Sequence, residues 1–316
     1  MLRHFAAALL CSAPLLASAA YPDKPVRLIV PFPPGSITDV VARSLAQGLN
    51  QELKQSIVVE NRAGANGIVG TGSAARSEAD GYTLFMVGVS TGASNVSAFR
   101  SLPYDPRKDF APIGLVAEAP FMLVTRADLP AKDVQGFVKY AKAHPGKLSY
   151  GYGSGSAQLC AAQVVAMGDF QATPVAYRGV PQAMTDLMGG TIDFTIADMV
   201  NGMQQSRAGR VTALGVTSKA RSPLAPELPS LSEAGLTGYD LTVWFGMAAP
   251  AGTPDAIVQR VNEALKHALG EPALREQFTS NGLAVRYSSA QEFKSVIDSE
   301  IDKWGKIFAD AKLTPQ

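Results

Sequence analysis

The chain has 316 residues, of which 47% are hydrophobic and 17% charged, and its net charge at pH 7 is +1. This composition is typical of a globular protein of about two domains. Lys and Arg balance Asp and Glu and form no basic stripe or acidic tail, so the sequence argues against a nucleic-acid or anionic-lipid partner.

The first twenty residues have the pattern of a secretory signal peptide. Two polar residues precede the apolar run Phe5–Leu16, and Ala17–Ala19 offers small residues for cleavage. The run is shorter than the roughly 20 residues that cross a bilayer. We therefore predict that residues 1–20 are removed on secretion. Cys11 leaves lipidation open as an alternative, although the residues before it are bulky for a lipidation site.

After the signal peptide, strands and helices alternate along the chain. Apolar runs and helical spacing predict strands at 26–31, 57–60, 83–89, 148–150, 173–176, 192–196 and 211–216, with one or two strands in 113–125. The predicted helices are 39–53, 68–76, 131–143, 156–167, 181–188 and 199–208. Such alternation is typical of an α/β protein with mainly parallel sheets and helices on both faces.

The last third of the chain changes character. Residues 222–235 are Pro-rich and irregular, 242–254 hold one apolar strand, and 289–311 form a helix with an apolar stripe. That stripe must pack on an earlier sheet. We therefore predict that the chain returns to its first domain at the end. Domain I comprises residues 21–122 plus 226–316, and domain II comprises 123–225.

One strand-to-helix junction, Val30–Asp39, reads VPFPPGSITD. Its prolines stiffen the loop, and several of its polar side chains can cap the following helix. A helix N-terminus offers unpaired N–H groups, and ligands of α/β sheets bind at the carboxyl ends of strands. Plain capping, with an Asp39–Arg43 pair on the helix surface, is the alternative. The candidate ligand contacts of this loop are Phe32, Pro34, Gly35, Ser36, Thr38 and Asp39.

A second junction, Leu148–Gln158, reads LSYGYGSGSAQ. Its glycines let the backbone approach a ligand and form a nest of N–H groups, and its serines can donate hydrogen bonds. A flexible connecting loop is the alternative. The candidate contacts of this loop are Tyr152, Gly153, Ser154, Gly155 and Ser156. Two such junctions predict a cleft that holds a small acid from both sides, in which valine at Gly35 or Gly153 should abolish binding without unfolding the protein.

Other polar residues follow predicted strands and reach the same sheet edges. Ser90 follows the strand at 83–89, and Tyr177 and Arg178 end the strand at 173–176. Arg178 can pair with a carboxylate or form a surface ion pair. Asp198 can accept a ligand N–H or hydroxyl, or cap the next helix.

The sequence lacks the motifs of an enzyme. GYGSGS has no phosphate-loop lysine, and Tyr152 stands where a nucleophile elbow around Ser154 needs glycine. His144 and His267 lie on predicted helix surfaces, far apart in sequence. We therefore expect no catalysis, no cofactor and no metal. A ligand-sensing module for a signalling partner and, less favoured, a small-molecule hydrolase remain as alternatives.

Many ordered motifs resemble those of the Bug family, the periplasmic solute receptors of tripartite tricarboxylate transporters. The resemblance covers essentially the whole mature chain. Its motifs are YPDKPVRLIVPFPPG (21–35), VVENRAGANG (58–67), DGYTL (80–84), LPYDPRKDFAPIGL (102–115), HPGKLSYG (144–151), AYRGVPQAMTDLMGGTID (176–193) and WFGMAAPAGTP (244–254). Two departures are Ser36, where the family usually has glycine, and Tyr152, which stands in a loop of small residues.

The resemblance implies a two-domain periplasmic binding protein of the Venus-flytrap type. Its ligand would be a dicarboxylate, tricarboxylate, acidic amino acid or aromatic acid, held by backbone amides, hydroxyls and water between the domains. The protein would be a periplasmic monomer and would deliver the ligand to a membrane permease. If Phe32 and Tyr152 flank the ligand, an aromatic acid is favoured.

Overall fold

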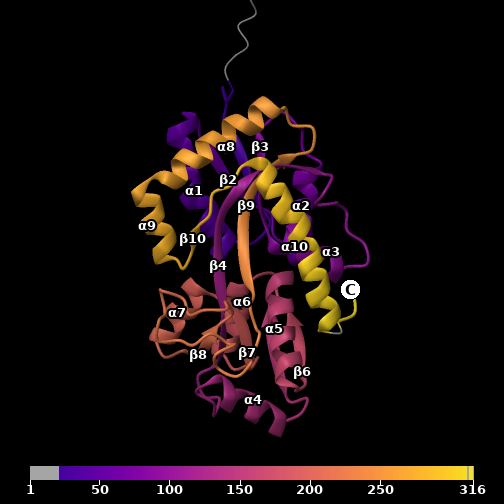
Figure 1. Cartoon of the computed structure of the whole chain (residues 1–316), viewed down its shortest axis with the longest axis vertical. Helices are drawn as coiled ribbons and strands as arrows, with labels where there is room; N and C mark the ends of the chain where they lie inside the picture. The colour runs from indigo at the N-terminus through magenta and orange to yellow at the C-terminus, as the bar shows by residue number, and fades with distance from the viewer. Residues whose placement is uncertain (1–20, 312, 316) are drawn as a thin grey trace, which may run out of the picture.

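A computed structural model describes residues 21–311 and 313–315. The predicted signal peptide, with Cys11, lies outside these residues. The α/β fold class is confirmed: two sheets, A and B, share one long strand, and helices cover both. Figure 1 shows an upper part built on sheet A and a lower part built on sheet B. We call these the A half and the B half.

The A half contains a sheet in the order β2-β1-β3-β9-β4, with β10 also paired to β4. Its strands are β1 (Val26–Val30), β2 (Ile57–Asn61), β3 (Thr83–Gly88), β9 (Thr242–Pro250), β10 (Ala284–Val285) and the first part of β4 (Phe110–Arg126). Its helices are α1 (Ile37–Leu53), α2 (Ile68–Ala75), α3 (Asn95–Ala98), α8 (Asp255–Gly270), α9 (Pro272–Ser280) and α10 (Ala290–Asp310), with the short turns η1 (Ala65–Gly67) and η2 (Ser90–Ser94).

The B half contains the order β4-β7-β5-β6, with β8 also paired to β4. Its strands are β5 (Leu148–Tyr152), β6 (Ala172–Ala176), β7 (Phe194–Asp198), β8 (Val211–Val216) and the second part of β4. Its helices are α4 (Val134–Ala143), α5 (Gly155–Gly168), α6 (Val180–Met188) and α7 (Met199–Arg207).

The sheets are mixed, which corrects the expectation of mainly parallel sheets. The pairs β1–β2, β1–β3, β5–β6 and β5–β7 are parallel. The pairs that involve β4 or β9 are antiparallel. The reason is the route of the chain: β4 leads from the A half into the B half and β9 returns beside it, so the two run in opposite directions.

Strand β4 passes from one sheet to the other between two adjacent residues. Pro120 is its last residue paired with β9, and Phe121 is its first residue paired with β7. The return segment contacts β8 at Ser230, which pairs with Val216. The division into domains at residues 122/123 and 225/226 stays a prediction.

The C-terminal helix packs on the A half, as its apolar stripe predicts. Phe293 and Trp304 are completely buried, and Phe293 meets Trp244 of β9 edge to face, with ring centroids 5.5 Å apart. A side chain at Gly246 would place Cβ 2.1 Å from the Phe293 ring, so glycine there allows the helix to approach the sheet. Figure 1 shows α10 running from the upper part down beside α5.

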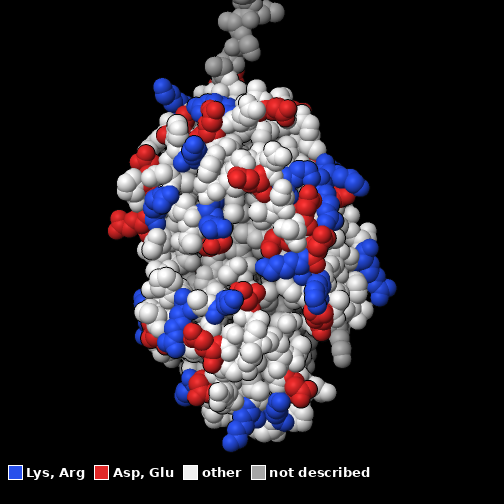
Figure 2. All heavy atoms as spheres, in the orientation of Figure 1, with Lys and Arg blue, Asp and Glu red and all other residues white. Residues whose placement is uncertain are grey.

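The described surface carries both charge signs. Figure 2 shows Lys and Arg interspersed with Asp and Glu on the displayed face. Within residues 21–311 and 313–315, no helix combines the length and hydropathy needed to cross a membrane.

Candidate functional site

A small pocket lies where loops of the two halves meet. It follows the carboxyl ends of β1, β3, β5, β6 and β7, which is the edge where ligands of α/β sheets bind. Its internal volume is about 40 Å³. The residues that line it are Phe32, Ser36, Ile37, Thr38, Gly88, Val89, Ser90, Phe121, Gly153, Ser154, Ser156, Gly179, Val180, Asp198, Val243 and Phe245. The two predicted junctions thus share one cavity.

Four helices begin at this pocket. Their N-cap residues are Ser36 for α1, Ser154 for α5, Gly179 for α6 and Asp198 for α7, and all four line the cavity. The N-terminus of a helix carries about half a positive charge, worth about 0.3–1 kcal/mol to a nearby anion. No Lys, Arg or His is among the described lining residues. Positive charge at the pocket from the described lining residues is therefore that of the helix N-termini.

Several backbone donors at the pocket have no hydrogen-bond partner among the described residues. The N–H groups of Ile37 and Thr38 are the first two of α1, and that of Val180 is the first of α6. Such groups have no acceptor within their own helix. Among the described residues none of the three makes a hydrogen bond, and neither does the Thr38 hydroxyl. The A half and the B half thus each present free N–H donors to the cavity.

Three serine hydroxyls join the two halves at the cavity. Ser156 Oγ lies 3.0 Å from Ser90 Oγ and 3.3 Å from Ser154 Oγ. The Ser156 N–H donates to Ser90 Oγ at 3.1 Å, and the Ala157 N–H donates to Ser154 Oγ at 3.2 Å. Three hydroxyl protons share only two O···O contacts. At least one proton is therefore left over to donate to a ligand.

Asp198 ends β7 and caps α7. Its Oδ1 accepts from the Asn201 N–H at 2.9 Å, and its Oδ2 accepts from Asn201 Nδ2 at 2.8 Å. The residue is only 3% exposed. Burial raises the pKa of this carboxyl above its ordinary value, because it outweighs the hydrogen bonds from Asn201 and the nearby N–H groups of Asp198 and Val200, which act in the other direction.

The first loop is held in place by side chains behind it. Ser36 N–H donates to Pro33 O, and Gly35 has φ +79° at the third position of this turn, as a type II turn requires. Asp39 Oδ2 accepts from the Gly35 N–H and from Arg43 Nε, both at 3.0 Å. Asn61 Nδ2 donates to Phe32 O at 3.0 Å and to Asp39 Oδ1 at 2.8 Å.

Asp39 therefore positions the loop and does not face the cavity. Burial raises the pKa of its carboxyl, but the hydrogen bonds from Arg43, Gly35 and Asn61, together with the Arg43 charge, outweigh burial and hold that pKa below its ordinary value. Asp39 stays ionised and bonded at neutral pH. The Asp39–Arg43 pair, the alternative from the sequence, is present.

The glycines of the second loop serve close packing. A Cβ on Gly153 would lie 2.1 Å from the carbonyl carbon of Gly179, and one on Gly155 would lie 2.5 Å from Asn95 Oδ1. Neither glycine has a positive φ. The expected nest is therefore wrong, since it needs left-handed backbone. Valine at Gly153 would displace neighbouring backbone, so the expectation that it leaves the fold intact is also wrong.

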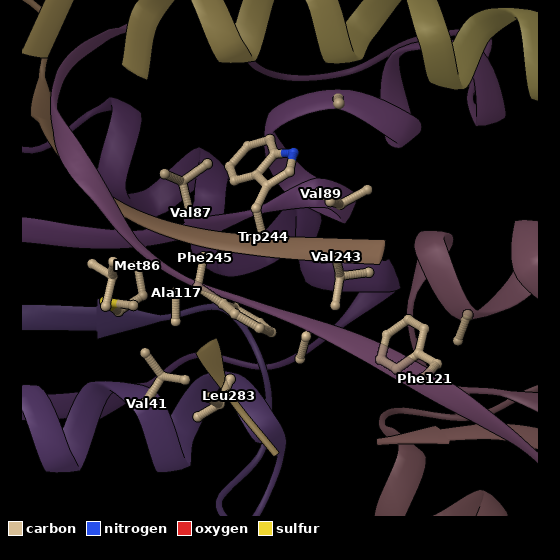
Figure 3. Packing of buried hydrophobic residues seen from close by; sticks show 14 of the residues in the cluster. Val41, Met86, Val87, Val89, Ala117, Phe121, Val243, Trp244, Phe245 and Leu283 are labelled. Carbon is tan, nitrogen blue, oxygen red and sulfur yellow. The ribbon is translucent and has the colours of Figure 1, made fainter. Parts of the chain in front are cut away.

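An apolar wall closes the pocket. It consists of Phe32, Val89, Phe121, Val243 and Phe245. Figure 3 shows Trp244 and Phe245 leaving β9 on opposite faces, and Phe121 and Val243 lying toward the B half. Trp244 belongs to the core, where Nε1 donates to Glu300 Oε2 at 3.0 Å.

About half of the ligand contacts predicted from the sequence line the cavity. Those that line the cavity are Phe32, Ser36, Thr38, Ser90, Gly153, Ser154, Ser156 and Asp198. Those that do not are Pro34, Gly35, Asp39, Tyr152, Gly155, Tyr177 and Arg178.

Three of the predicted contacts that do not line the cavity make other interactions. Tyr152 is buried, and its carbonyl accepts from the Tyr177 N–H at 2.8 Å. Tyr177 Oη donates to Asp186 Oδ2 at 2.7 Å, and the exposed Arg178 donates its N–H to Gln182 Oε1. The expectation that Phe32 and Tyr152 flank an aromatic ligand is therefore wrong.

Half of the lining residues are not among the contacts predicted from the sequence. These are Ile37, Gly88, Val89, Phe121, Gly179, Val180, Val243 and Phe245. Gly179 and Val180 carried a usable signal, because glycine before a proline in the first helical turn marks a helix start. The apolar residues carried none, since any core strand has the same pattern. In the described part of the chain, no cluster of three His, Cys, Asp or Glu residues could hold a metal ion.

The chain matches a known family and known structures. The family model described as "Tripartite tricarboxylate transporter family receptor" matches residues 41–313. Protein BugT of Bordetella pertussis is 34% identical over 307 residues, which cover 96% of this chain and 94% of BugT. The periplasmic binding protein BugD is 32% identical with a TM-score of 0.90, over 94% of this chain and 100% of BugD.

Two further similar structures contain a dicarboxylate. An R. palustris protein with adipate is 32% identical, with a TM-score of 0.91 over 94% of this chain and 100% of that chain. MatC from Rhodopseudomonas palustris, with bound malate, is 30% identical, with a TM-score of 0.87 over 91% of this chain and 99% of that chain.

Proposed function

Because this chain belongs to the tripartite tricarboxylate transporter receptor family, whose Bug members are periplasmic binding proteins, we propose that it captures a small carboxylate between its two halves and delivers it to a membrane permease. The family and fold are those of solute-binding receptors. The proposal places the mature protein in the periplasm. It acts there as a monomer, because both walls of the pocket come from one chain.

The observation that carries this proposal is the convergence of four helix N-termini on a pocket without a side-chain cation among its described lining residues. Together they are worth about 1–4 kcal/mol to an anion if their contributions add. A surface ion pair contributes only about 0–1 kcal/mol. The pocket can therefore hold a carboxylate without arginine or lysine.

The free donors fit the geometry of a carboxylate. Ile37, Thr38 and Val180 offer N–H groups, and the serine cluster offers at least one O–H. A carboxylate has about four acceptor positions, so donors from opposite walls can share them. A ligand held in this way stabilises the closed arrangement of the halves.

The ligand is a dicarboxylate, tricarboxylate, acidic amino acid or aromatic acid. The narrow cavity and the adipate and malate of the two similar structures favour a compact aliphatic diacid. Tyr152 does not line the pocket, so it cannot be used to argue that the ligand contains an aromatic ring.

A thermal-shift panel of mono-, di- and tricarboxylates, amino acids and aromatic acids tests the proposal. A ligand at a hundred times its dissociation constant stabilises by about 2.7 kcal/mol, which raises Tm by roughly 5 °C or more. We expect at least one acid to give such a shift. Loss of acid uptake on gene deletion supports delivery to a permease, whereas binding without any effect on uptake favours the signalling alternative.

Thr38→Val locates the bound acid. The substitution keeps the side-chain shape and removes a pocket hydroxyl that has no described protein partner. We expect affinity to fall three- to tenfold with little change in Tm. Thr125→Val is the matched control, because it removes a buried hydroxyl in β4 outside the pocket. If both variants bind as tightly as the natural protein, this pocket does not hold the acid.

A further inference from the structure

Asp198 is the only ionisable side chain among the described residues that line the pocket. It lies in the same cavity as the free N–H donors that favour an anion. Its carboxylate caps α7, but it also lines the cavity that is proposed to hold an anionic ligand. This mismatch points to a feature of the ligand.

The hydrogen bonds of Asp198 leave acceptor capacity unused. Each oxygen accepts one bond, and both donors belong to Asn201. No ion pair of the described residues includes Asp198. Its partner across the sheet is Phe121, which is apolar and also lines the pocket. The N–H groups of Asp198 and Val200 lie near the carboxyl, but the only donors bonded to it among the described residues are those of Asn201. Since a carboxylate has about four acceptor positions, it can accept a further bond from a ligand in the pocket.

A ligand that carries a hydrogen-bond donor beside its carboxylate can bond Asp198 and so offset the repulsion between the two carboxylates. Two carboxylates close together in a poorly hydrated pocket repel each other. A hydroxyl or ammonium group on the ligand donates to Asp198 and removes the cost of an unpaired buried acceptor. A site built to bond such a group discriminates strongly against the analogue that lacks it.

We propose that Asp198 makes this site selective for a carboxylic acid that also carries a hydroxyl or an ammonium group close to its carboxylate. The proposal rests on the proposed function, since it presumes that an acid binds in this pocket. The donor is the shared chemistry of hydroxy acids and amino acids.

Calorimetric titration with matched ligand series tests the proposal. The series are succinate, malate and aspartate; glutarate, 2-hydroxyglutarate and glutamate; and phenylacetate, mandelate and phenylglycine. In each series the carbon skeleton is constant and only the donor changes. We expect a donor-bearing acid to bind at least tenfold more tightly than the plain acid of its series. The preferred member identifies the donor as hydroxyl or ammonium.

Asp198→Asn tests the residue itself. Asparagine is as good an N-cap as aspartate, so α7 keeps its cap. In this variant the new amide oxygen can still accept from the Asn201 N–H, while the amide NH₂ group takes the place of the second carboxylate oxygen. We expect the preference for the donor-bearing acid to fall below threefold. Asp133→Asn, at the exposed cap of α4, is the matched control and should leave the preference unchanged.

The outcomes separate this proposal from the proposed function. If the plain acid of a series binds as tightly as its donor-bearing relative, the pocket binds acids but the role of Asp198 is refuted. An unchanged preference in Asp198→Asn refutes it as well. If no acid of the three series or of the thermal-shift panel binds, both proposals are wrong.

Discussion

At the scale of single residues, the polar positions of the pocket could be predicted and the apolar ones could not. Ser36, Ser154 and Asp198 each follow a strand and precede a helix, so the sequence alone placed them at the carboxyl edge of a sheet. Phe121 and Val243 reach the pocket only because the two halves meet there. No periodicity within one strand encodes that meeting.

The raised pKa of Asp198 makes the free energy of unfolding depend on pH. Its folded-state pKa lies above the ordinary value of 3.8 because burial disfavours the charged form. The folded protein therefore binds the proton more tightly than the unfolded chain. The stability that this proton gives is fully present below pH 3.8 and is lost as pH rises through the raised pKa.

Asparagine at position 198 does not titrate, so Asp198→Asn should not lose stability as pH rises through the pKa of Asp198. We expect the ligand-free variant to have a larger free energy of unfolding than the natural protein at pH 7, with the difference vanishing near pH 4. Urea unfolding of both proteins at each pH measures the difference, in which all other titrating groups cancel. A variant that is less stable at pH 7 would show that the carboxylate itself stabilises α7.

The hydroxyl of Thr125 is a second feature whose effect on stability can be tested. Its hydroxyl is buried in β4 and has no hydrogen-bond partner among the described residues. An unsatisfied buried polar group costs about 1–3 kcal/mol, and valine fits a strand well. We expect Thr125→Val to raise the free energy of unfolding by about 1 kcal/mol, measured by urea unfolding. A decrease would reveal a hidden partner, such as a buried water.

Among the secondary-structure elements, two strands extend two residues beyond their predicted ends, and this difference determines which of the predicted contacts line the pocket. The strand predicted at 148–150 runs to Tyr152. Since side chains in a strand alternate between faces, Tyr152 shares the buried face of Tyr150 and is carried away from the cavity. The strand predicted at 192–196 runs to Asp198, which places that residue at both the strand end and the helix start.

The first loop depends on Asn61, which ends β2 outside the pocket. Asn61 bonds Phe32 O and Asp39, and its Oδ1 accepts from Arg43 Nη2 at 3.0 Å. We expect Asn61→Ala to weaken binding of the acid roughly three- to tenfold and to cost about 1–2 kcal/mol of stability, because the loop loses its anchor. Calorimetry and urea unfolding measure the two effects.

Asn50→Ala is the matched control for that variant. Asn50 Oδ1 accepts from the Ile57 N–H at 2.6 Å, near the far end of α1. Its loss should also lower stability but leave the affinity for the acid unchanged. Equal affinity in Asn61→Ala and the natural protein would contradict the positioning role of Asn61.

At the scale of the whole molecule, the return of the chain to its first half could be predicted from the stripe on α10. The mixed sheets could not, because alternating strands and helices do not show that β4 and β9 run in opposite directions between the halves. Strand β4 and the return segment that leads into β9 form the two connections about which the halves could hinge.

Ser90 bonds Ser156 across the pocket and so holds the halves together. We expect Ser90→Ala to favour an open arrangement, with a larger ligand-free radius of gyration by small-angle scattering. Ser44→Ala, at a buried serine of α1, is the control and should leave that radius unchanged. Identical scattering of Ser90→Ala and the natural protein would show that other contacts close the pocket.

Calorimetric titration with a tightly bound acid and with its neutral amide tests whether the backbone donors select a carboxylate. The two ligands have nearly the same shape, and only the acid carries a negative charge. Because helix N-termini and unpaired N–H groups surround the pocket, we predict that the acid binds at least a hundredfold more tightly than the amide. Equal affinity for both would contradict the claim that backbone donors select a carboxylate.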